Sequence, residues 1–208
     1  MTGRIKGIVA VALVLIVAGV VVMWTFVLPE RSVDLDTFSK RVGSPGSATG
    51  SFSERSIVGA LAYSIARVTS GRVDDFWALT GHGQAMASLT FHAQDGRSQN
   101  IAVDVVDTST GQSGLASCHA GPRCTVTTPM TGATLAVEQT LYGTGVKAVL
   151  TDPDRHLHVD VQAQGTLLTA DQIAAVAGAQ WWALGAPRNI VTASRRLKVQ
   201  HIATGFTD

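Results

Sequence analysis

The sequence has almost no excess of charge of either sign. Its 208 residues contain 16 Lys and Arg against 15 Asp and Glu, and only 15% of the residues are charged. A nucleic-acid-binding protein needs a strongly basic face, so this balance argues against nucleic acid as a partner. The apolar fraction of 46% is that of a folded protein and excludes disorder along the whole chain.

The sequence also lacks the motifs of the common catalytic sites. It has no Gly-x-Ser-x-Gly, His-Glu-x-x-His, Gly-x-x-x-x-Gly-Lys or Gly-x-Gly-x-x-Gly, and residues 111–114 (Gly-Gln-Ser-Gly) fall one residue short of the first. The adjacent Asp74 and Asp75 fit a solvated turn better than an acid–base pair, because neighbouring side chains point apart. We therefore predict no catalytic residue, no metal ligand and no cofactor.

One long apolar run is present, at residues 8–28. Nineteen of its 21 residues are hydrophobic and none is charged. At about 1.5 Å per residue the run spans roughly 30 Å, the thickness of the hydrocarbon core of a bilayer. Arg4 and Lys6 precede it and every Asp and Glu follows it. The positive-inside rule therefore places the N-terminus in the cytoplasm and the residues after 28 outside.

Two other interpretations of this run fit less well. A cleaved signal peptide has an apolar region of about 7–15 residues and a small-x-small cleavage site, whereas this run is longer and has Trp24 and Phe26 near its end. A buried core helix seldom continues for this length without a polar face. We expect five regions: residues 1–7 in the cytoplasm, a transmembrane helix at 8–28, a linker at 29–52, an extracytoplasmic α+β domain at 53–185, and a basic C-terminal tail at 186–208.

Helical periodicity marks the two ends of the expected domain. Ser53 is a suitable N-cap for an amphipathic helix whose apolar stripe runs from Ile57 to Val68. The sequence at 169–172, Thr-Ala-Asp-Gln, is a capping box that predicts the start of a second helix, which packs on a sheet and ends by Trp181 and Trp182. One ring that caps the core and a second that lies half-buried are a better interpretation than a ligand-stacking platform. Residues 73–79 fit either a short helix or an extended segment.

Between the two helices, alternating apolar and polar residues predict an antiparallel sheet of about five or six strands. Residues 85–92 and 101–106 alternate on either side of Asp95-Gly96, the pattern of a β-hairpin. Further strands are expected at 123–128, 134–142, 146–151 and 156–164. We expect a meander with one buried face.

Together these features resemble a group of uncharacterised exported proteins of actinobacteria. The likeness covers residues 53–184 and includes the amphipathic helix, the hairpin, the pair Cys118 and Cys124, the strands around residues 152–155, and the helix start at 167–173. Members carry one N-terminal membrane segment or export signal, and some are encoded beside extracytoplasmic-function sigma factors. The resemblance implies a location and a fold but no activity.

Cys118 and Cys124 are the only cysteines. An even number of cysteines outside the cytoplasm favours a disulfide, and Gly121-Pro122 favours the tight turn that the bridge needs. A redox pair usually has Cys-x-x-Cys spacing, and two thiolates with His119 make an incomplete zinc set.

His156 and His158 have the spacing that places two side chains on one face of a strand. A metal site needs at least a third ligand, for which His92 and Asp160 are the candidates, so two solvated surface histidines are the simpler interpretation. The basic residues between Arg188 and Lys198 fit either a solvated tail or a contact with an anionic membrane surface or cell-wall polymer.

These observations favour a single-pass membrane-anchored module with a non-catalytic binding, sensing or accessory role at the cell envelope. Its expected partners are the membrane and either another envelope protein or a cell-wall polymer. The alternative is a cell-envelope hydrolase or a metal-dependent enzyme, for which His156, His158 and a loop Ser or Asp are the candidate residues. An anti-sigma role would have to operate through a partner, because seven cytoplasmic residues are too few to hold a sigma factor.

The first prediction concerns the two thiols. In protein purified from an oxidising compartment, Cys118 and Cys124 should resist alkylation until a reductant is added, as mass spectrometry would detect. Replacing both should lower the free energy of unfolding by roughly 2 kcal/mol or less, because the closed loop is short. Complete alkylation without reductant would contradict the bridge.

Overall fold

A computed structural model describes residues 29–46, 51–110, 123–130, 132–139, 144–182 and 185–200. The chain divides into two units, residues 1–30 and 31–208, and the helices and strands described below belong to the second. Its first half contains β1 (Ser32–Asp34), α2 (Leu35–Val42), α3 (Glu54–Ala66), β2 (Arg72–Gly81), β3 (Gln84–His92) and β4 (Ser98–Asp107). Its second half contains β5 (Cys124–Met130), β6 (Ala133–Gln139), β7 (Gly145–Asp152), β8 (Leu157–Gln164), α4 (Ala170–Ala177) and α5 (Arg188–Ser194), with short 3₁₀ turns at Thr108–Thr110 and Pro153–Arg155.

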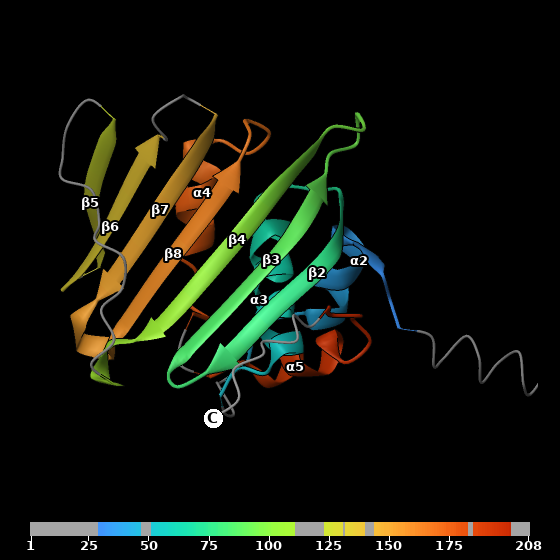
Figure 1. The fold of residues 1–208 in the computed structure, drawn as a ribbon, viewed down its shortest axis with the longest axis horizontal. Coiled ribbons are helices and arrows are strands. Elements are labelled where there is room, and N and C mark those ends of the chain that lie inside the picture. The colour runs from blue at the N-terminus through green and yellow to red at the C-terminus, as the bar shows by residue number, and fades with distance from the viewer. Residues whose placement is uncertain are drawn as a thin grey trace, which may run out of the picture. The chain divides into compact units, whose positions relative to one another are not determined.

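The strands form one antiparallel sheet in the order β1-β2-β3-β4-β8-β7-β6-β5 (Figure 1). Strands β1 to β4 make one meander and β5 to β8 make another. The two meanders join where β4 pairs with β8, with Val103 opposite Val161 and Asp104 opposite Asp160. We call this pairing the central seam. The predicted α+β class with an antiparallel sheet is confirmed, but the described sheet has eight strands and β4 pairs with β8 instead of β5.

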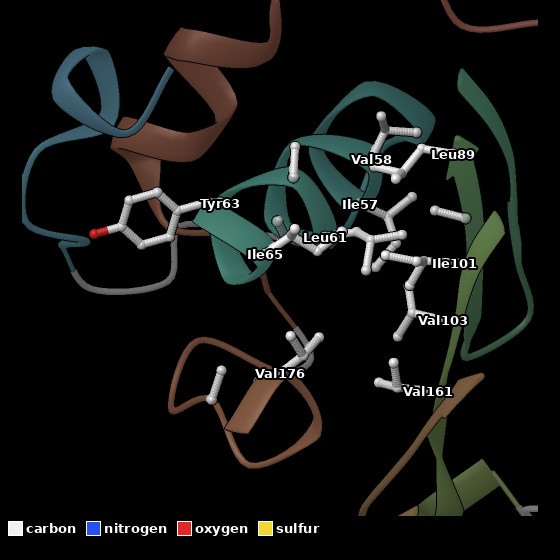
Figure 2. Close-up of a cluster of buried hydrophobic side chains, with 14 of the residues drawn as sticks. Ile57, Val58, Leu61, Tyr63, Ile65, Leu89, Ile101, Val103, Val161 and Val176 are labelled. Carbon is white, nitrogen blue, oxygen red and sulfur yellow. The ribbon is translucent and has the colours of Figure 1, made fainter. Parts of the chain in front are cut away.

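The helices lie on one face of this sheet (Figure 1). α3 packs on β2 and β3, and α4 packs on β6, β7 and β8. Figure 2 shows Ile57, Val58 and Leu61 of α3 directed toward strand residues such as Leu89 and Ile101. This layer between sheet and helices is the hydrophobic core.

α3 is buried all round. Ser53 caps it as predicted, since its hydroxyl accepts from the Ser56 amide while the Ser56 hydroxyl accepts from the Ser53 amide. Every residue from 56 to 65 is buried, because α2 and α5 cover the side of α3 that faces away from the sheet. Tyr63 points to that side and donates to the Gly43 carbonyl at 2.8 Å (Figure 2).

The expected linker at 29–52 is wrong for its first part. Residues 32–42 form β1 and α2, and Leu35, Phe38 and Val42 are buried on the domain. The reason is a short apolar stripe at spacings of three and four, which places all three side chains on one face of the helix.

The expected tail at 186–208 is also wrong for its described part. Ile190, Ala193 and Leu197 are buried, and α5 packs on α3 and α2. The Gln200 amide then donates to the Phe76 carbonyl in β2 at 2.8 Å. Residues 201–208 lie outside the described part of the chain.

Two of the remaining local predictions are confirmed, and the ambiguous segment at 73–79 is a strand. The hairpin around Asp95-Gly96 and the capping box at Thr169 are present, whereas residues 73–79 belong to a full strand, β2. A bulge with a positive φ at Asp75 breaks the alternation of β2 and hides the strand from its pattern. No helix in the described ranges has both the length and the apolar character to cross a bilayer, and the span predicted at 8–28 lies outside those ranges.

The contact between α3 and α5 generates the second prediction. A Cβ on Gly59 would lie 1.7 Å from the Ser194 Oγ and 2.9 Å from the Ser194 Cβ. Gly59→Ala should therefore lower the free energy of unfolding by about 2 kcal/mol, as overpacking of a core does, although alanine is the better helix former. Denaturant unfolding of the full chain measures this.

Two further variants test the cause of that loss. Gly46→Ala is the control, because nothing lies within 4 Å of its added Cβ, and it should be nearly neutral. Adding Ser194→Gly to Gly59→Ala should restore much of the stability by removing the overlapping side chain. A neutral Gly59→Ala would show that α5 does not pack on α3 in solution.

Candidate functional site

A cluster of polar side chains lies on the sheet face opposite the helices, at the central seam. Asp104 in β4 and Asp160 in β8 are directly opposite each other, and His158 lies two residues from Asp160 on the same face. Lys147 reaches this cluster from β7, with its Nζ 3.0 Å from the Asp160 Oδ2. We call these four residues the seam cluster.

The seam cluster is largely closed to solvent. Asp160 is 2% exposed and His158 5%. The Gln84 side-chain amide donates to both carboxylate oxygens of Asp104 at 2.9 Å. The His158 Nδ1 lies 3.3 Å from the Thr151 hydroxyl, while its Nε2 has no hydrogen-bond partner among the described residues. Asp160 accepts no hydrogen bond from those residues, so the ion pair of its Oδ2 with Lys147 is the contact that offsets its charge.

Burial sets the ionisation of this cluster. It raises the pKa of Asp104, and the negative charge of Asp160 adds to the rise while the Gln84 hydrogen bond opposes it. Burial also lowers the pKa of His158, and this outweighs the attraction of Asp160 and Asp104 for a protonated imidazole. The imidazole is therefore neutral at pH 7 although two carboxyl groups lie beside it.

The other predicted ligands are not brought to the seam cluster. His156 precedes β8, with φ 51° at the end of the 3₁₀ turn, and is exposed, so the two histidines share no strand face. The His92 Nε2 is 2.7 Å from the Asp74 Oδ1. His92 lies opposite Ser98 in β4, six residues from Asp104 and thus roughly 20 Å along the sheet. Within the described ranges, no three His, Cys, Asp or Glu residues are arranged to hold a metal ion.

The structure corrects two further expectations. His158 is not a solvated surface residue, because its side chain is buried beside Asp160 in β8. Asp74 and Asp75 are not a solvated turn, because they lie in β2. The Asp74 carboxylate contacts the His92 imidazole, and Asp75 forms the bulge.

The structure describes both tryptophans but only one of the two cysteines. Cys124 begins β5 and is buried, whereas Cys118 and residues 111–114 lie outside the described ranges, so the disulfide stays a prediction. One tryptophan is buried and the other is half-buried, as expected. The Trp182 ring is fully buried and donates to the Val176 carbonyl, and the Trp181 ring stacks edge-on against Tyr63 at 4.9 Å.

The helix layer contains a second candidate site, a groove of about 680 Å³ between α2 and α5. It is lined by Arg41, Val42, Arg188, Asn189, Thr192, Ala193, Arg195 and Arg196. Four of these eight described residues are arginines and none is acidic. We call this site the arginine groove.

Hydrogen bonds across the helix layer hold the walls of the groove together. The Arg41 guanidinium donates to the Ala193 carbonyl at 3.5 Å and lies 5.9 Å from the centre of the Phe38 ring. Asn189 donates to the Ser44 carbonyl at 2.7 Å, and Arg55 donates to the Arg195 carbonyl at 3.2 Å. The groove is therefore fixed by contacts between segments far apart in the sequence.

A concave surface lined by charges of one sign focuses its field and attracts ions of the opposite sign. Guanidinium groups bind carboxylates and phosphates through paired N–H donors. The arginine groove is therefore suited to an anion. The sequence shows the bases at 188–198, but only the fold adds Arg41, which is remote in the chain.

No protein-family model matches this chain, and the comparisons with curated proteins and with solved structures found no match.

The third prediction uses the lowered pKa of His158. The unfolded histidine, with a pKa near 6.5, takes up a proton that the folded protein excludes, so stability should fall as the pH drops through about 6.5. The loss approaches 1.4 kcal/mol per pH unit for one proton. Denaturant unfolding of the full chain from pH 7.5 to 5 measures it.

His158→Gln should remove this part of the pH dependence, whereas His156→Gln, at an exposed position, should retain it. Asp104 acts in the opposite direction, because its raised pKa stabilises the folded state as the pH falls through that pKa. An unchanged pH profile in His158→Gln would show that the imidazole is not excluded from protonation.

Proposed function

We propose that this chain is a single-pass membrane-anchored module of the cell envelope that binds an anionic ligand in the arginine groove and catalyses no reaction. One observation carries this proposal: the groove has four arginines and no acid among its eight lining residues. Its volume is in the range of ordinary ligand pockets, about 300–1,000 Å³.

The chemistry of the groove favours phosphate or carboxylate groups. Arg188 and Arg195 are exposed at its rim, and none of the hydrogen bonds described above uses their guanidinium groups. Asn189 and Thr192 add uncharged hydrogen-bonding side chains to the lining of the groove. The walls are preorganised by the Arg41, Asn189 and Arg55 hydrogen bonds, which reduces the entropy lost on binding.

The arrangement of the other polar residues gives the enzyme alternative less support. A hydrolase or metal-dependent site that used His156 and His158 together would need both at one accessible place. His158 is buried in the sheet and His156 is exposed before it, so these two residues cannot share a reacting atom.

The membrane anchor rests on the sequence. The 21-residue apolar run at 8–28, with its basic residues before and its acids after, supports a cytoplasmic N-terminus and an extracytoplasmic domain. The domain begins directly after this run, because β1 starts at Ser32.

The fourth prediction tests the groove with inorganic tripolyphosphate as the probe. Full-length protein in a neutral detergent should bind it, and binding should weaken with added salt. The double variant Arg188→Gln/Arg195→Gln should bind at least about tenfold more weakly, because two charge-assisted hydrogen bonds are lost. Isothermal titration calorimetry measures the affinity.

Arg67→Gln/Arg97→Gln is the matched control, since it removes the same charge from exposed positions outside the groove. It should bind tripolyphosphate nearly as the natural sequence does. Equal weakening in the two double variants would show non-specific attraction and would refute the groove as the binding site.

A further inference from the structure

The basic surface extends beyond the groove itself. Lys40 precedes Arg41 in the last turn of α2, and Lys198 follows Arg196 after α5. Lys40 and Lys198 are exposed, as are all four arginines of the groove. In α2 these bases lie in the last turn and the acid of the helix, Asp36, lies in the first turn. Residues 185–200 contain no acidic residue. The surface therefore presents six cations from two neighbouring helices and the residues beside them.

A surface of this kind suits a lipid bilayer better than a single small anion. Clusters of four to eight Lys and Arg immediately cytoplasmic of a membrane span bind anionic phospholipids, each base adding to the attraction. Anionic headgroups in an outer leaflet offer the same charge to a basic surface on that side. Long arginine side chains place their guanidinium groups at the phosphate level while their apolar stems cover other apolar atoms. Val42 and Ala193 provide such atoms within the groove.

The covalent connection limits how far this surface can move from the membrane. β1 starts at Ser32, four residues after the predicted span ends, so it begins within about 15 Å of the bilayer surface even for a fully extended chain. α2 follows directly and is about 12 Å long. A tether this short makes docking an intramolecular event with a high effective concentration of headgroups.

We propose that the arginine groove docks on the phosphate headgroups of anionic lipids in the outer leaflet of the membrane that anchors the chain. This inference rests on the proposed function, because it names the ligand of the same groove. A phosphate-bearing cell-wall polymer offers the same chemistry, but it lacks the short covalent connection that favours the lipid.

The experiment measures how fast each arginine reacts with phenylglyoxal, a guanidinium-specific reagent. Full-length protein is placed in nanodiscs of phosphatidylcholine, with or without phosphatidylglycerol, and the modified residues are quantified by mass spectrometry. Arg188 and Arg195 should react about tenfold more slowly in the anionic nanodiscs, and 0.5 M salt should abolish the difference. Arg67 and Arg97 should react equally in both, as controls within the same molecule.

Variants extend the test. In Arg188→Gln/Arg195→Gln, the remaining groove arginines should react at similar rates in the two kinds of nanodisc. In Arg67→Gln/Arg97→Gln, the protection of Arg188 and Arg195 should persist. Equal reaction rates in the two bilayers, or slowing that extends to Arg67 and Arg97, would overturn the inference.

Soluble competitors separate this inference from the proposed function. Suppose that tripolyphosphate or a poly(glycerol phosphate) protects Arg188 and Arg195 but anionic nanodiscs do not. The groove then binds a soluble anion or polymer, so the proposed function stands and the lipid inference fails. If no anion protects these arginines, both are wrong.

Discussion

The pairing of β4 with β8 is the interaction on which the rest of the domain depends. It is where the two described meanders join, so the continuous surface under α3 and α4 exists only if this pair forms. On the helix side the pair is apolar, with Val103 opposite Val161 and Val105 opposite Val159. On the other side it places Asp104 opposite Asp160, an arrangement of like charges that destabilises a sheet. Lys147 and Gln84 offset that cost with an ion pair and two hydrogen bonds.

The asymmetry of the two sheet faces also explains where the arginine groove lies. The helices gather on one face, and α3 is enclosed between the sheet and the pair α2 and α5. Because the outer surfaces of α2 and α5 are not needed for the core, they are free to carry charge. Arg41 and Arg188 meet there although they are 147 positions apart in the chain. The groove is thus a product of the same packing that buries α3.

Local sequence signals predicted local structure well. The caps at Ser53 and Thr169, the Asp95-Gly96 turn and the alternation of β3 and β4 each depend on a few adjacent residues, and each is present. The central seam could not be predicted, because alternation in β4 and β8 does not say which strands pair. The sequence of β2 was ambiguous because the bulge at Asp75 breaks its alternation. The helices α2 and α5 were not predicted, because their apolar stripes contain only two or three residues. For the candidate site, spacing alone placed His156 and His158 on one face, whereas the 3₁₀ turn separates them. The arginine groove needs the tertiary fold to bring Arg41 to α5.

The enclosure of α3 has a consequence for the making of the protein. The side of α3 that contains Gly59 is covered by α5, which ends at Ser194. At roughly 5–20 residues per second, a ribosome needs about 6–25 s to extend the chain from the end of α3 to the end of α5. During that interval a helix with apolar residues on every side lacks one of its coverings. Until α5 has been made, the exposed apolar surface of α3 makes the nascent chain prone to aggregation.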